Sequence, residues 1–172
     1  MARLSRLSVS GALLAMASAA LAQPPPAEEA PDEPRYLRVV RHELERMGVD
    51  AACETEGRAR GTCTFTHVAT EPAGRWSVQL VVSDQSHTVY LAVLDLARIA
   101  PNGPSTDRRL RALAELNWSA TGTHLDWDPR TGAVRLAAVQ RTDTNFDRRA
   151  FRVLLRLLLS RAERFAPQLA ES

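Results

Sequence analysis

Apolar positions along this chain recur with two different spacings, which separate predicted helices from predicted strands. Apolar residues three and four positions apart, with charged residues between them, predict a first amphipathic helix over about 34–47. Gly48 is suited to end it, because glycine tolerates the left-handed conformation found just beyond helix ends. A second helix is expected from a cap at Ser105 or Thr106 to a stop at Gly122.

The last predicted helix carries the broadest apolar stripe. Its start is indicated by Thr144 and Asp147, whose spacing resembles a capping box. The stripe consists of Phe151, Leu154, Leu155, Leu158, Ala162 and Phe165, and it is widened by Val153, Leu157 and Leu159. Because so broad a stripe needs cover on more than one side, we expect this helix to pack across a sheet and also to contact a partner. The residues expected at that interaction surface are Phe151, Leu155, Leu158 and Leu159.

Between the first two helices the spacing changes to two, which is typical of strands. The runs with this pattern, or rich in β-branched residues, are 61–68, 76–82 and 88–96, and they predict an antiparallel meander. In the third run Val89, Leu91 and Val93 face one way, and Tyr90 and Leu94 face the other. That strand is therefore central, or its second face meets another subunit, and we add Val89, Leu91 and Val93 to the expected interaction surface.

A β-hairpin is the clearest element after the second helix. Alternating residues over 123–127 and 134–138 flank a turn over 128–132, which has Pro129 early and Gly132 at its end. The whole order is helix, three strands, helix, two strands and a long helix. This order predicts an α+β fold with a five-stranded sheet and helices packed on it.

The first 22 residues have the features of a secretory signal peptide. Arg3 and Arg6 are followed by an uncharged stretch, and a small-x-small site predicts cleavage between Ala22 and Gln23. The alternative, an uncleaved membrane helix, needs a longer apolar stretch, and no cysteine follows the site to carry a lipid anchor. We expect an exported protein without a stable membrane anchor, periplasmic or secreted. Residues 23–34 form a proline-rich linker, and residues 35–170 form one domain.

Cys53 and Cys63 are the only cysteines. An even number in an exported chain favours a disulfide between them. A redox or metal site is the alternative, but nine intervening residues differ from the Cys-x-x-Cys spacing of such sites.

The charge balance restricts the partners. The chain has 22 basic residues, all of them arginine, against 20 acidic ones, and loss of the signal peptide removes Arg3 and Arg6, so the mature chain is neutral. Nucleic acids and anionic membranes attract a concentrated basic excess, so we expect neither as a partner. The arginines of 35–46, 108–111 and 148–156 are interpreted as a solvated face, with an anionic partner surface as the alternative.

The sequence contains no recognisable catalytic motif. The histidines at positions 42, 67, 87 and 124 lack metal-ligand spacing, and Asp126 and Asp128 are explained by the chemistry of the hairpin turn. The chain has no lysine, no phosphate-binding loop and no nucleophile elbow. We therefore expect no catalytic, cofactor-binding or metal-binding residues and no cofactor.

The stretches 113–117 (Leu-Ala-Glu-Leu-Asn) and 125–132 (Leu-Asp-Trp-Asp-Pro-Arg-Thr-Gly), with a strand and a Leu- and Phe-rich final helix after them, resemble the bacterial YbjN family. That family shares the architecture of type III secretion chaperones. The resemblance implies a small scaffold, often a homodimer, that offers its sheet and helices to a protein partner. It implies no catalytic residues.

The function expected from these observations is a non-enzymatic, exported, protein-binding or chaperone-like module of the bacterial envelope. The alternative is a small-ligand-binding or sensory domain, with a pocket between the sheet and the helices near Trp76, Tyr90 and Trp127. A hydrolase or redox enzyme would need titratable groups that converge in a cleft.

Overall fold

The computed structural model of this chain describes residues 33–70, 73–143 and 145–171. The expected signal peptide, its cleavage site between Ala22 and Gln23, most of the proline-rich linker, and the first half of the capping box at Thr144 lie outside the described residues. The end of the linker lies inside them. Glu33 pairs with the guanidinium of Arg41 at 2.6 Å, and the carbonyl oxygen of Pro34 accepts the Leu37 N–H at 3.1 Å.

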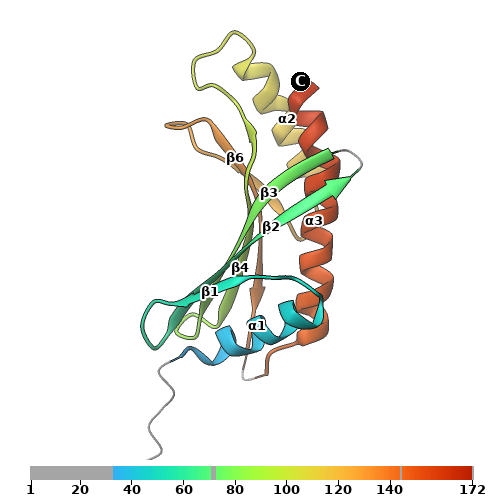
Figure 1. Ribbon diagram of the computed structural model, residues 1–172. Coiled ribbons are helices and arrows are strands. Elements are labelled where there is room, and N and C mark those ends of the chain that lie inside the picture. The colour runs from blue at the N-terminus through green and yellow to red at the C-terminus, as the bar shows by residue number, and fades with distance from the viewer. Residues whose placement is uncertain (1–32, 71–72, 144, 172) are drawn as a thin grey trace, which may run out of the picture. The chain divides into compact units, whose positions relative to one another are not determined.

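The described residues form three helices and six strands (Figure 1). In chain order they are α1 (Arg35–Arg46), β1 (Ala52–Thr55), β2 (Arg60–Thr70), β3 (Ala73–Ser83), β4 (Thr88–Arg98), α2 (Thr106–Ser119), β5 (His124–Trp127), β6 (Ala133–Arg141) and α3 (Arg148–Glu171). The α+β class and the predicted order of helices and longer strands are confirmed.

The strands form one antiparallel sheet in the order β1-β2-β3-β4-β6-β5. The sheet has six described strands, and the prediction of five was wrong because β1 was missed. β1 has only four residues, Ala-Cys-Glu-Thr, with no apolar alternation to reveal it. It pairs with β2 from Ala52 to Thr55, at the edge of the sheet. β4 lies between β3 and β6, so the prediction that it is a central strand is confirmed.

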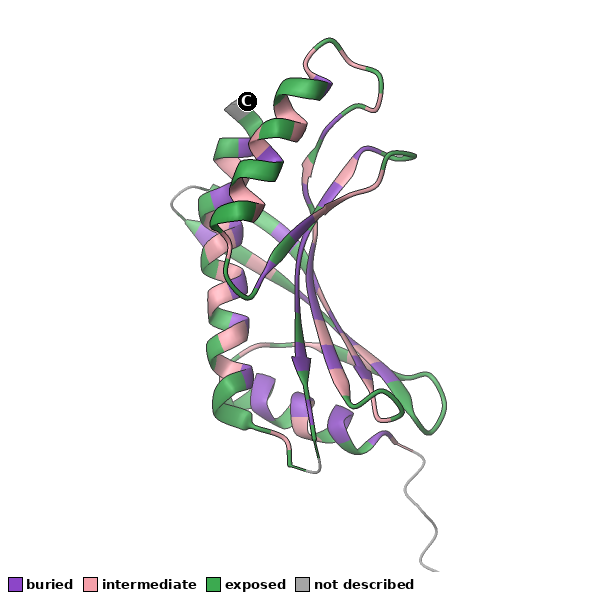
Figure 2. Cartoon of the chain, turned by 180° about the vertical axis from the view of Figure 1, so that it is seen from behind, coloured by how far each residue is buried: buried purple, intermediate pink, exposed green. Residues whose placement is uncertain are grey.

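All three described helices pack on the same side of the sheet, as Figures 1 and 2 show. α1 contacts β1, β2 and β3, α3 contacts β4 and β6, and α2 contacts β5 and α3. The approach of α1 to β2 is close, since a Cβ atom built on Gly61 would lie 2.5 Å from Cδ2 of Leu37. A glycine at this position therefore lets the helix settle on the strand.

The helix-facing side of the sheet is shielded from solvent. Val78, Leu80, Val89, Leu91 and Leu136 have no exposed surface there, because the side chains of α1 and α3 cover them. Burial of apolar surface on this scale is the main favourable contribution to folding. The predicted amphipathic patterns of α1, β3, β4 and α3 thus form a single core.

The helices begin differently from the predictions. The hydroxyl of Ser105 makes no capping hydrogen bond to α2, whereas the Thr106 hydroxyl accepts from the Gly103 N–H at 2.9 Å and contacts the Ala100 carbonyl oxygen. At α3, the Asp147 carboxylate accepts the Ala150 N–H at 2.9 Å, which is the geometry of an N-cap. Asp147 therefore serves as the cap itself.

Asn117 connects α2 to β5. Its amide donates to the Leu125 carbonyl oxygen at 2.9 Å and accepts from the Leu125 N–H at 2.6 Å, so it imitates a neighbouring strand. Its neighbour Trp118 is 95% exposed. None of the helices within the described ranges is long and apolar enough to cross a membrane.

Candidate functional site

Most residues predicted to form an interaction surface lie inside the molecule. Phe151, Leu155 and Leu158 of α3 have no exposed surface, and neither do Val89, Leu91 and Val93 of β4; only Leu159 is partly exposed. The two sets cover each other, because α3 packs across β4. As a surface for a partner, the prediction was therefore wrong for these six buried residues. These apolar side chains form part of the core.

The side of the sheet opposite the helices is the surface that remains. We call it the helix-free face, and no described helix covers it (Figure 2). One row of directly paired residues crosses four strands on this face, and it consists of Thr62, Val81, Tyr90 and Val139. Val139 is 50% exposed, and Val68, on the same face of β2, is 60% exposed. The centre of the helix-free face is thus apolar, and the outward side of β2 carries threonines at positions 62, 64, 66 and 70.

A hollow of about 550 Å³ opens beside the β5–β6 hairpin. Leu94, Trp127 and Pro129 supply its apolar walls, and Asp126 and Arg135 are among its charged residues. A β-bulge between Val93 and Ala97 shapes the β4 side of the hollow, with Asp95 at φ +47°. Because a bulge twists a strand locally, it turns this end of β4 away from regular pairing.

Tyr90 lies at the centre of the helix-free face. The guanidinium of Arg135 sits 5.7 Å from the centre of its ring, within the range of a cation–π contact. Burial raises the pKa of the Tyr90 hydroxyl, although the charge of Arg135 opposes this. Its oxygen is buried and has no hydrogen-bond partner among the described residues.

Of the two aspartates of the hairpin, Asp128 performs the turn chemistry predicted from the sequence, whereas Asp126 makes a cross-strand ion pair instead. The Asp128 carboxylate accepts the Arg130 N–H at 2.9 Å and the Thr131 hydroxyl at 3.1 Å, and these bonds, led by the backbone N–H, lower the pKa of Asp128. The Asp126 carboxylate pairs with Arg135 at 3.0 Å. The hydrogen bond to Asp126 in turn raises the pKa of Arg135.

The histidines are dispersed. His42 is near Glu45, His67 pairs with Glu163 of α3 at 2.8 Å, His87 is near Tyr36, and His124 is near Asp126. Within the part of the chain that the structure describes, no three His, Cys, Asp or Glu side chains gather as a metal site would require. Trp76 and Tyr90 lie on opposite faces of the sheet, so they do not line the single pocket expected near them.

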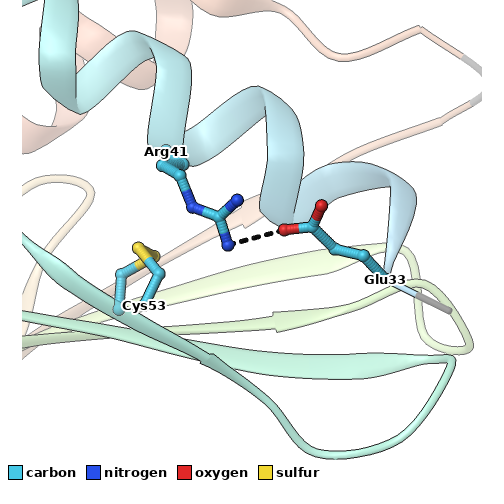
Figure 3. The surroundings of a disulfide bond; sticks show 4 residues. Glu33, Arg41 and Cys53 are labelled. Carbon is cyan, nitrogen blue, oxygen red and sulfur yellow. Dashed lines mark ion pairs between the residues drawn. A yellow bond between two sulfur atoms is a disulfide. The ribbon is translucent and has the colours of Figure 1, made fainter.

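Cys53 and Cys63 form a disulfide, in agreement with the predicted pairing. They lie directly opposite each other in the β1–β2 ladder, and the bond lies beneath α1, as Figure 3 shows. In the same view the guanidinium of Arg41 points from α1 toward Glu33. The bond therefore fastens the edge strand beneath α1, close to where the described chain begins.

Glu43 is a site residue that sequence reasoning missed. It lies among the arginines of 35–46, which the sequence predicts to form a solvated face, but Glu43 has no exposed surface. Its carboxylate lies 3.3 Å from Arg148 and 3.9 Å from Arg46, and it accepts a hydrogen bond from Arg152. The sequence held no signal for this arrangement, because Arg148 and Arg152 are more than a hundred positions away along the chain.

The buried carboxylate of Glu43 should make the stability of the fold depend on pH. Burial alone would raise the pKa of Glu43, but the hydrogen bond from Arg152 and the charges of Arg152, Arg46 and Arg148 outweigh it, so the pKa lies below its ordinary value of 4.5. A carboxylate whose pKa is lower in the folded state than in the unfolded state stabilises the fold at pH values above its unfolded-state pKa. This stabilisation is lost as the pH falls through the folded-state pKa.

The ordinary pKa of glutamate is 4.5. We therefore expect the free energy of unfolding of the wild-type chain to decrease when the pH is lowered beyond this value. In Glu43→Gln this part of the pH dependence should be missing. Urea titrations at a series of pH values measure the difference between the two proteins. Identical pH profiles would contradict the ionised, buried state of Glu43.

Comparison with known proteins concerns the fold. A chain in the crystal structure of the ExsC–ExsE complex superimposes with a TM-score of 0.54 and 21% sequence identity, and the alignment covers 78% of this chain and 92% of that chain. No protein family model matches this chain, and no curated protein sequence does. At this identity the likeness establishes the fold alone. The described residues thus share the α+β fold of that chain.

Proposed function

We propose that this protein is a non-enzymatic, chaperone-like module that binds a protein partner through the helix-free face of its sheet. The observation that carries the proposal is the apolar row across β3, β4 and β6 that no described helix covers. Apolar surface at the centre of a polar rim is typical of protein interfaces. The threonines of β2 and the charged residues of the hairpin supply that rim.

Two further features support a protein partner. The hollow beside the hairpin has room for side chains of a partner, and it combines the aromatic wall of Trp127 with the charged groups of Asp126 and Arg135. Trp, Tyr and Arg are the residue types that contribute most to binding in protein interfaces. In addition, the solved chain of similar fold was crystallised as part of a complex.

We also propose that the protein is exported and that it belongs with YbjN-like proteins, as the stretches 113–117 and 125–132 suggest. Cleavage between Ala22 and Gln23 would release the mature protein into the periplasm or the medium. The bond between Cys53 and Cys63 supports export, because disulfides persist in oxidising compartments.

The binding proposal is tested with two exposed apolar residues on opposite sides of the molecule. Val139 is 50% exposed on the helix-free face, and Trp118 is 95% exposed on α2. Proteins recovered from a bacterial envelope extract by the wild-type chain would be identified, purified and titrated against Val139→Glu and Trp118→Glu. We expect Val139→Glu to weaken binding about tenfold or more, because it buries a charge, whereas Trp118→Glu binds like wild type. Equal effects of both variants would refute the helix-free face as the site.

Export is tested by the intact mass of the protein recovered from an expressing bacterium. A non-reduced mass that begins at Gln23 and is lower by two hydrogens is expected, and light scattering is expected to give the mass of a homodimer. A mass that includes Met1 and both thiols would refute export and the disulfide together. A monomeric particle would refute the dimer and leave the other two conclusions standing.

A further inference from the structure

Three arginines converge on one buried carboxylate where α1 meets α3. Arg46 comes from the last turn of α1, and Arg148 and Arg152 come from the first turns of α3. All three approach Glu43, whose side chain is fully buried, while their own side chains are 60%, 48% and 32% exposed, in that order. We call Arg46, Arg148 and Arg152 the arginine cluster. Each of these arginines contacts the buried carboxylate of Glu43, while part of its side chain remains exposed to solvent.

The cluster has more donors than its carboxylate can satisfy. Each guanidinium carries five N–H donors, whereas one ionised carboxylate offers about four acceptor positions. Glu43 is ionised, since the nearby arginines hold its pKa below the ordinary value, and it balances only one of the three positive charges. Outward-facing donors and surplus positive charge therefore remain at one fixed place on the surface.

The other acids whose side chains are described in α1 and α3, or just before them, do not supply the missing acceptors. Glu33 pairs with Arg41, Glu45 is near His42, and Glu163 pairs with His67. Asp147 accepts the N–H of Ala150 as the cap of α3. This distinguishes the cluster from Arg60 and Arg135, each of which has its own carboxylate at 3.0 Å.

The surface continues along the exposed side of α3. Arg149, Val153 and Arg156 follow one another at helical spacing, and all three are exposed. Neither Arg149 nor Arg156 has an ion pair among the described residues. Val153 is 59% exposed, so an apolar contact lies among cationic ones.

We propose that the arginine cluster, together with Arg149, binds the carboxylates of an acidic peptide segment in a protein partner, and that Glu43 is the positioning residue that holds the cluster ready. Planar guanidinium groups pair with carboxylates through two parallel hydrogen bonds. Because Glu43 already restrains the three side chains, less side-chain freedom is lost when the peptide binds.

A short acidic peptide fits this surface better than an extended polyanion. The formal net charge of the whole chain is only +2, so no broad positive field exists to attract nucleic acid or an anionic membrane. Glu45 in α1, and Glu33 and Asp147 just before α1 and α3, limit the size of the basic surface. The cluster is on the helix side of the sheet, so this site is independent of the helix-free face and goes beyond the proposed function.

The test measures binding of a fluorescently labelled, glutamate-rich peptide to the full chain by anisotropy. Wild type is expected to bind it saturably, more weakly as salt is added, and not to bind the same peptide with glutamine in place of glutamate. Arg46→Gln/Arg148→Gln is expected to weaken binding at least about tenfold, because two charge-assisted contacts are lost. Arg75→Gln, which removes one exposed arginine on the opposite face, is expected to leave the affinity unchanged.

The proposal is wrong if the wild-type chain shows no saturable binding of the glutamate-rich peptide, or if it binds the glutamine peptide equally well. It is also wrong if Arg75→Gln weakens binding as much as Arg46→Gln/Arg148→Gln does. Binding to vesicles that contain phosphatidylserine, without binding to the peptide, would assign the cluster to a membrane instead. Thermal melts verify folding of each variant, and Arg46→Gln alone, at a 60% exposed position, replaces the double variant if that one does not fold. Because Val139→Glu leaves the cluster intact, failure here and failure of the helix-free face are distinguishable.

Discussion

Replacing Phe151 with alanine is expected to lower the free energy of unfolding by about 3–5 kcal/mol. Phe151 begins the buried stripe of α3 and has no exposed surface. Its ring centre lies 5.5 Å from that of Phe146, and it belongs to the core between α3 and the sheet. The truncation removes apolar contacts and leaves a cavity, because close-packed surroundings relax only partly.

The matched control for this prediction is Val153→Ala, two positions further along the same helix. Val153 is 59% exposed, so its truncation is expected to change the free energy of unfolding by about 0.5 kcal/mol or less. Urea denaturation followed by circular dichroism measures both variants. If Phe151→Ala were as stable as Val153→Ala, Phe151 would be outside the core, as the original expectation of an interaction surface implied.

Loss of the disulfide is the second large effect, with an expected cost of about 3 kcal/mol in the free energy of unfolding. Cys53 and Cys63 are separated by 10 positions, and a bond that closes such a loop restricts the unfolded chain. In the folded state the bond holds β1, a strand of four residues that pairs with a single neighbour at the edge of the sheet. The double variant Cys53→Ser/Cys63→Ser removes it.

Thermal and urea unfolding of the wild-type chain, with and without dithiothreitol, provide an independent measurement. The reductant is expected to destabilise wild type to nearly the same extent as the double variant, and to leave the double variant unchanged. A wild-type protein that is insensitive to the reductant would contradict a stabilising disulfide. Amide hydrogen exchange is expected to show the loss first in 52–55, the residues of β1.

Much of the fold was predictable from local pattern. The alternation from Trp76 to Val82 and the stripe from Phe151 to Phe165 each indicated which side chains share a face, and both faces are buried as that pattern implies. The hairpin was predictable because Pro129 and Gly132 meet the demands of its turn, and Gly132 indeed has φ +75°. β1 was not predictable, since pairing and a disulfide define it and its four residues carry no periodicity.

The candidate sites were less predictable than the fold. Alternation in β4 placed Val89 and Tyr90 on opposite faces, but it could not indicate which face α3 would cover. The apolar breadth of α3 was interpreted as a surface for a partner, although Phe151, Leu155 and Leu158 are buried in the core between α3 and the sheet. Sequence could predict the bond between Cys53 and Cys63 because they are the only two cysteines and their spacing does not fit the usual redox or metal motif.

By itself, the sequence determined the α+β class, the order of the longer elements and the hairpin turn, because each depends on neighbours within a few positions. It also determined the cysteine pairing, because the chain has only two cysteines. Only the tertiary structure decided which face of the sheet stays open and which charges are buried. Glu43 and Glu45 are both acids of α1, yet one is fully buried and the other is exposed. The difference arises because Arg148 and Arg152 reach Glu43 from α3, and no local pattern carries information about contacts made so far along the chain.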